Sequence, residues 1–163
     1  MANATPTQSL QYIDQVAEIS PRAKSSDIGS KLRYFFSQLT FTAASTTPFV
    51  SLHKMMKLPA GKARVITDLS RIICPAGTAT ADLHVGNAAY TKNDGTAGAA
   101  DDNSLADNVD VGGGAIDQAL TLPTAGFLEF DSRDGVDIEV LLDTEASPAA
   151  GVMYLMLAVM MGN

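Results

Sequence analysis

The stretch TATADLHV, residues 78–85, shows the periodicity that decides the fold. Apolar and polar side chains alternate along it, and the apolar ones are Ala79, Ala81, Leu83 and Val85. Successive side chains of a β-strand point to opposite faces of the sheet, so this alternation predicts a strand with one buried and one solvated face. We therefore expect the core to be built from paired strands.

Similar patterns recur on both sides of this stretch and are separated by turn-forming residues. One such turn is Leu58-Pro59-Ala60-Gly61, where Pro fixes φ and Gly permits positive φ, and another is Asp134-Gly135. The expected strands are 32–42, 49–56, 62–73, 78–85, 120–122, 127–130, 136–142 and 152–161. Many short strands with regular turn signals predict an all-β fold, an antiparallel β-sandwich or jelly-roll-like domain.

Two of these strands carry more apolar residues than one buried face requires, and a third has a core face that can be listed. Residues 32–42 have bulky side chains on both sides, which predicts a strand covered on both faces at one end. Residues 152–161 are apolar on both faces, so this strand is either central between two layers or covered by another subunit. For residues 62–73 we expect the core face to begin with Ala63, Val65, Thr67 and Leu69.

Two segments differ from this strand pattern. Residues 1–31 are interpreted as an extended N-terminal arm, with Leu10, Ile13 and Ala17 on one side of a short helix starting near Ser9. The β-sandwich domain would then span residues 32–163. Residues 87–114 are rich in Gly, Ala, Asp and Asn and poor in large apolar groups, so we expect a long excursion on the domain surface.

Charge is unevenly distributed along the chain. The net charge is 0 over residues 1–31, +5 over residues 32–73 and −12 over residues 74–163, which gives −7 in total. Unlike segments of different copies attract, so the chain is suited to a multi-subunit assembly. The pI near 4.6 disfavours contact with phosphate backbones, and we expect no nucleic-acid partner.

Length and composition limit the class of protein further. A chain of 163 residues fits one domain that can bury its own core, and the single cysteine, Cys74, cannot form an internal disulfide. The first ten residues lack the features of a secretory signal. The longest apolar run, 152–161, is about half of the roughly 20 residues that a membrane-spanning helix needs, so we expect no membrane partner.

No catalytic motif stands out. His53 and His84 lie in different expected strands without a ligand motif, and Cys74 lies beside Pro75 without a recognisable base. Residues 112–114 are Gly-Gly-Gly but lack the Gly-Lys-Ser/Thr ending of a phosphate loop. We therefore predict no enzyme, no catalytic, metal-binding or cofactor-binding residue, and no cofactor.

Two acidic groups remain as weaker candidates. Carboxylate and amide oxygens between residues 101 and 110 could surround a calcium ion, although the EF-hand order is absent; they belong to Asp101, Asp102, Asp107, Asp110, Asn103 and Asn108. Glu129, Asp131 and Asp134 could supply the paired carboxylates of a glycosidase, but the chain has no Trp for sugar stacking. A calcium-dependent β-sandwich binding module therefore stays an alternative.

Several motifs resemble the small decoration, or cement, proteins on the heads of tailed bacteriophages. They are the expected strand 49–56, the Leu58-Pro59-Ala60-Gly61 turn into Ala63-Arg64-Val65-Ile66, and Ala81-Asp82-Leu83-His84-Val85-Gly86 before a Gly/Asp-rich segment. The resemblance covers about a third of the chain. It implies symmetric clusters, often trimers, that are fixed on a capsid lattice and join neighbouring capsomers.

The resemblance defines the expected partners and location. It implies binding to the major capsid protein, self-association as a homotrimer, and a place in the virion after synthesis in the bacterial host cytoplasm. It assigns no catalytic residue. A tail-tube or head-completion protein of the virion is the nearest alternative, since such a protein would form rings rather than separate clusters.

Overall fold

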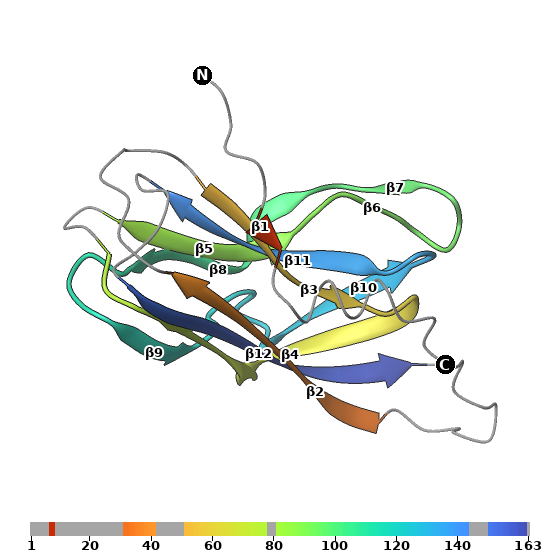
Figure 1. The fold of residues 1–163 in the computed structure, drawn as a ribbon. Coiled ribbons are helices and arrows are strands. Elements are labelled where there is room, and N and C mark those ends of the chain that lie inside the picture. The colour runs from red at the N-terminus through yellow and green to blue at the C-terminus, as the bar shows by residue number, and fades with distance from the viewer. Residues whose placement is uncertain (1–6, 9–30, 42–50, 78–80, 144–149, 163) are drawn as a thin grey trace.

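The computed structural model describes residues 7–8, 31–41, 51–77, 81–143 and 150–162. Within these ranges the chain is all-β and forms two stacked sheets, here called sheet A and sheet B, with a small hairpin extending from one end (Figure 1). The predicted β-sandwich is therefore confirmed. No helix within the described ranges is long and apolar enough to cross a membrane.

Sheet A has the strand order β1-β3-β11-β5-β8. All its pairs are antiparallel except that of β1 with β3, which is parallel. Its strands are β1 (Thr7–Gln8), β3 (Ser51–Leu58), β5 (Asp82–Asn87), β8 (Asp101–Asp110) and β11 (Val136–Asp143).

Sheet B has the strand order β10-β4-β12-β2, with β9 pairing along another part of β4. All pairs in this sheet are antiparallel. Its strands are β2 (Lys31–Phe41), β4 (Gly61–Cys74), β9 (Ile116–Ala119), β10 (Phe127–Ser132) and β12 (Gly151–Gly162).

The core lies between the two sheets and follows the period of two. In β11 the fully buried side chains are Val136, Ile138, Val140 and Leu142, as the alternation of this strand predicts. Ala81, Leu83 and Val85 are buried in the same way, while Ala79 lies outside the described residues. A buried hydroxyl also joins the sheets, because Ser37 Oγ in β2 donates a hydrogen bond of 2.5 Å to the carbonyl of Met55 in β3.

The predicted core face of β4 is correct only in its first half. Ala63, Val65 and Thr67 are buried, but Leu69 is 48% exposed, and burial resumes at Ser70 and alternates from there. The cause is a bulge, since the register between β4 and β12 shifts between Met156 and Ala158. Two steps along β12 face five steps along β4 here, and an odd number of extra residues reverses the face of every side chain that follows.

Ser70 completes this bulge with its side chain. Its hydroxyl donates to the carbonyl of Ile66 at 2.7 Å and accepts from the backbone N–H of Ala158 at 3.0 Å. Thr67 is tied in another way, because its N–H donates to the carbonyl of Gly126 at 3.0 Å. Backbone groups that the bulge removes from the ladder therefore find other partners, as buried polar groups must.

The prediction that β2 is covered on both faces is wrong within the described chain. Phe35, Leu39 and Phe41 turn toward the core, but Tyr34 is 56% and Phe36 51% exposed on the other face. The first alternative for residues 152–161 is not found in the described chain: β12 lies centrally within sheet B between β4 and β2, but Met156 and Met160 on its outer face are partly exposed. Cover by another subunit stays a prediction.

The predicted surface excursion over residues 87–114 is also wrong. It contains the ten-residue strand β8 and a hairpin of β6 (Tyr90–Thr91) and β7 (Ala97–Gly98). Few apolar residues suffice because each is buried, namely Leu105, Ala106, Val109 and Val111. Asn87 holds both ends of the hairpin segment, since its amide donates to the carbonyls of Ala88 and Ala99 and accepts from Ser104 Oγ.

Smaller differences concern the ends of elements. The expected strand at 120–122 is absent from the described structure, and β9 precedes it at Ile116–Ala119. The helix expected near Ser9 lies outside the described residues. The division into an arm over 1–31 and a domain over 32–163 stays a prediction, although strand β2 begins at Lys31.

Candidate assembly surfaces

The candidate catalytic residues do not come together. His53 is buried and packs edge-on against Phe41, with ring centroids 5.5 Å apart. Cys74 is a fully buried part of the core, as expected for a filler. Backbone N–H groups of the turn at 112–114 are bonded within the chain and do not point at a ligand. Asp110 Oδ1 accepts from the N–H groups of Gly112 at 2.8 Å and Gly113 at 3.1 Å.

His84 has a partner that the sequence analysis missed. Its Nδ1 lies 2.9 Å from Asp107 Oδ1, because β5 and β8 are neighbours in sheet A. The pKa of Asp107 is lowered, first by a hydrogen bond from Asn103 and then by His84. A gap of 23 residues in sequence hides such a pair until the strand register is known.

The acidic group at residues 101–110 is spread along β8 instead of surrounding a common centre. Asp110 stands opposite Asp82, and Asp82 stands opposite Asp143, so three carboxylates form a row across β8, β5 and β11. Like charges directly opposite each other destabilise a sheet. Among the described residues, no three His, Cys, Asp or Glu side chains are grouped closely enough to share a metal ion.

The second acidic group is divided among separate partners. Glu129 accepts from Arg64 Nε at 2.7 Å, and Asp131 accepts from the side-chain amide of Asn93. Asp134 lies in the exposed turn before β11. The pair of facing carboxylates that glycoside hydrolysis requires is not formed by these three described residues.

The charge division along the sequence becomes a division between the two sheets. Among the side chains that the structure describes, the strands of sheet B carry four basic and four acidic groups and are neutral. The described strands of sheet A carry two basic and eight acidic groups, a net charge of −6. Of the two described sheets, only sheet A is therefore strongly acidic.

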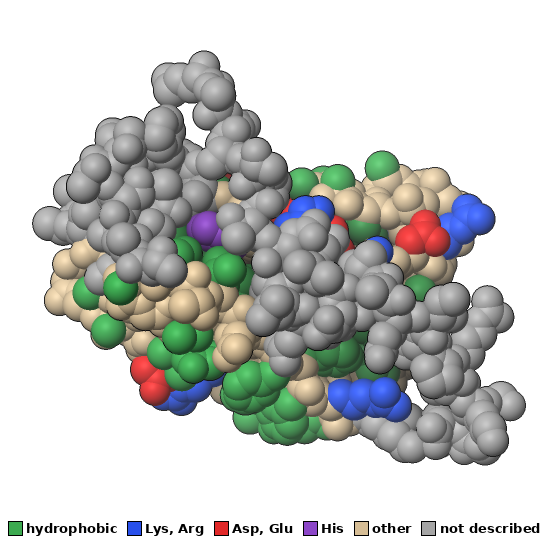
Figure 2. Space-filling view, in the orientation of Figure 1, with side chains coloured by type: hydrophobic (Ala, Val, Ile, Leu, Met, Phe, Trp, Pro, Cys, Tyr) green, Lys and Arg blue, Asp and Glu red, His purple; other side chains and the backbone are tan. Residues whose placement is uncertain are grey.

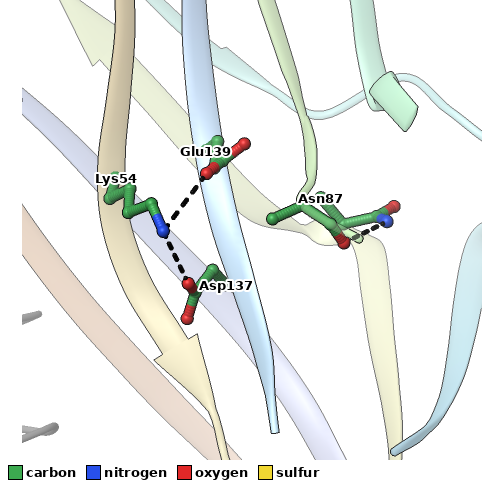
Figure 3. Close-up of polar contacts among 5 residues, drawn as sticks. Lys54, Asn87, Asp137 and Glu139 are labelled. Carbon is green, nitrogen blue, oxygen red and sulfur yellow. Dashed lines mark hydrogen bonds and ion pairs between the residues drawn. The ribbon is translucent and has the colours of Figure 1, made fainter. Parts of the chain in front are cut away.

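The most buried charges of sheet A lie where β3 meets β11 (Figure 3). Lys54 Nζ donates to Asp137 Oδ2 at 2.9 Å and lies 3.8 Å from Glu139 Oε1. Burial raises the pKa of Glu139; the ammonium of Lys54 opposes this rise, and the carboxylate of Asp137 adds to it. The single positive charge of Lys54 thus compensates only part of the negative charge of Asp137 and Glu139.

This arrangement predicts a specific dependence of stability on pH. Because the pKa of Glu139 is higher in the folded than in the unfolded chain, the folded state binds more protons, and stability falls as pH rises above the ordinary carboxyl range. We expect Glu139→Gln to remove this loss. Its melting temperature, relative to that of the unsubstituted protein, should increase as the pH rises above the ordinary carboxyl range and become constant once Glu139 is ionised in the folded state.

Asp102→Asn is the matched control, because it removes one negative charge from an exposed position of the same sheet. Thermal melts of the three proteins in a common buffer series provide the comparison. A difference between Glu139→Gln and the unsubstituted protein that stays constant across the range would contradict the assignment.

Sheet B presents the opposite chemistry on its outer face. Among the described residues, every large hydrophobic side chain that is exposed belongs to this sheet: Leu32, Tyr34, Phe36, Leu69, Ile73 and Phe127. Figure 2 shows hydrophobic side chains gathered over β2 and β12. The strand register continues this face, since Tyr34, Ala158, Ile66 and Phe127 lie side by side across β2, β12, β4 and β10.

Two ion pairs lie on this outer face. Arg64 bonds to Glu129 and also lies over the ring of Phe127, 4.5 Å from its centroid. Arg71 bonds to Asp117, which lowers the pKa of Asp117 and raises that of the guanidinium. The outer face of sheet B is therefore apolar in its middle and carries balanced ion pairs along β4.

Comparisons with known proteins agree with this fold. No family model matches the chain, and no curated protein matches it. A chain in the solved capsid of Ralstonia phage GP4 is similar in structure, with a TM-score of 0.61 and 19% sequence identity. The match covers 98% of this chain and 99% of that chain. At this identity the likeness establishes a shared fold.

Proposed function

We propose that this chain is a structural protein of a phage virion that binds the outside of the capsid and cements neighbouring capsomers as a trimer. The observation that carries the proposal is the likeness to a chain of a phage capsid over almost the whole length of both proteins. The surfaces agree with such a role, because the described strands of sheet A carry a net charge of −6 and sheet B exposes large hydrophobic side chains. The proposed partner is the major capsid protein.

The acidic sheet A is the better candidate for contact with the capsid. Its charge of −6 and its polar side chains suit a wet, reversible contact with a basic surface. Charged groups in such a contact are screened by salt. The strength of capsid binding should therefore depend on ionic strength.

We expect the purified full-length chain to sediment with capsids that lack it, and to bind roughly tenfold more weakly when NaCl is raised from about 0.05 M to about 0.5 M. The bound fraction is measured by quantitative gel analysis of the pellet. Binding that does not change with salt would assign the contact to an apolar surface. Failure to bind at low salt would contradict the cementing role.

The position of the protein in the virion distinguishes the remaining alternatives. Gold-labelled antibodies against the chain should mark the outside of the head in electron micrographs of intact particles. Label confined to the tail or the neck would replace the proposal with a tail-tube or head-completion role. Purified virions without the protein would remove the virion role altogether.

A further inference from the structure

We propose that the outer face of sheet B is the surface through which copies of this chain bind one another. The occupant of this face is thus a second copy of the same chain. The inference rests on the proposed function, which supplies the trimer, and adds the surface through which the three copies bind. It is carried by the apolar area, the balance of charges and the edge of β2 that no described strand pairs with.

The exposed apolar area is large for a monomer. Six large side chains are between 36% and 56% exposed on the described part of sheet B. With side-chain areas of about 150–250 Å² for such residues, they contribute roughly 500 Å². This equals the largest patches of ordinary monomers, and the partly exposed Ile66, Met156 and Met160 extend it toward the ~800 Å² that each partner buries in a stable complex.

The charges favour a copy of this chain over another partner. The described charges on the outer face of sheet B are nearly balanced, with three basic and four acidic groups, so copies can meet there with little repulsion, although each chain carries −7. Packing through sheet B also keeps the acidic sheets of the copies on the outside, far from each other. Arg64, Glu129, Arg71 and Asp117 supply both signs in equal number, so different parts of this face can meet around a threefold axis without a surplus of like charge.

The edge of sheet B also needs protection. Within the described ranges, β2 is paired on one side only, with β12, over eleven residues. Long apolar edge strands attract other chains unless they are covered. A neighbouring copy that packs against Leu32, Tyr34 and Phe36 would cover the part of β2 that is most exposed.

The test is the mass of the purified full-length chain in solution. We expect light scattering after size exclusion to give about three times the 17.0 kDa of one chain. In the double variant Tyr34→Thr with Phe36→Thr, the dissociation constant should rise by roughly 100-fold or more, because aromatic anchors dominate such interfaces. Thr keeps the preference for strand, so the variant should remain folded, as far-UV circular dichroism checks.

Two controls separate loss of the interface from loss of the fold. Tyr34→Phe with Phe36→Tyr keeps both rings on the face and should keep the mass. Asp102→Asn alters the other sheet and should also keep it. The mass should further stay constant between about 0.05 M and about 1 M NaCl, since an apolar interface is little affected by screening.

The outcomes also distinguish this inference from the proposed function. A dimer that dissociates in the Thr double variant keeps the interface and removes the trimer. A monomeric unsubstituted protein at about 50 µM, or a Thr double variant that keeps its full mass, overturns the inference. If the unsubstituted protein is monomeric and the Thr double variant fails to bind capsids, the capsid protein is the occupant, and capsid binding survives while the interface between copies does not.

Discussion

Gly86→Ala should lower the free energy of unfolding by at least about 3 kcal/mol. A Cβ atom at this position would lie 2.0 Å from the carbonyl oxygen of Asp101 and 2.3 Å from the carbonyl carbon of Asp102. Both contacts are with backbone, which cannot rotate away as a side chain can. Strand β5 lies between β11 and β8, so it cannot move from β8 without disturbing its pairing with β11.

Gly113→Ala is the control for Gly86→Ala. Its Cβ would meet Asp110 Oδ2 at 3.4 Å, which is an ordinary contact, so we expect a change within about 1 kcal/mol. Urea unfolding of the two variants, followed by circular dichroism, measures the difference. Equal stability of the two would mean that β5 and β8 do not approach each other as described.

Leu142→Ala should cost about 2–5 kcal/mol, whereas Leu141→Ala should cost about 1 kcal/mol or less. The two residues are the same type and adjacent in β11, but Leu142 is fully buried between the sheets, and Leu141 lies on the outer face of sheet A. Truncating Leu142 removes contacts with its neighbours and leaves a cavity where the packing cannot collapse completely.

Urea unfolding of both variants tests which face of β11 is the core. The comparison needs no further control, because the mutated side chains are identical and only their direction differs. A larger loss in Leu141→Ala would mean that the register of sheet A is shifted by one residue.

Most strands could be predicted because the alternation of apolar and polar residues is visible within each strand alone. Val136, Ile138, Val140 and Leu142 alternate with residues that are mostly polar, and no information from other strands is needed to place them inward. The bulge in β4 could not be predicted in this way. It depends on the N–H of Ala158, almost ninety residues further along the chain, which Ser70 binds.

The candidate surfaces were only partly predictable for the same reason. The charge division is visible in the sequence, but its assignment to two sheets depends on the strand order. Tyr34 and Phe36 were expected to be covered, because bulky side chains on both sides of a strand usually are; the described chain leaves them exposed. The sequence pattern therefore predicted that this face is covered. It could not show that the described part of this chain leaves the face open.

The central place of β12 has a consequence for how sheet B forms. Strands β2 and β4 are joined only through β12 within the described part of the sheet, and β12 follows β4 by more than seventy residues. The entropy cost of closing so long a loop must be met before the contacts of β12 with β4 form. This makes folding slow, in the range of milliseconds to seconds for β-sandwiches. Until β12 pairs with them, β2 and β4 each keep an unpaired, apolar edge. Sheet B, the less charged of the two sheets, is therefore the part of the folding chain that is open to aggregation for longest.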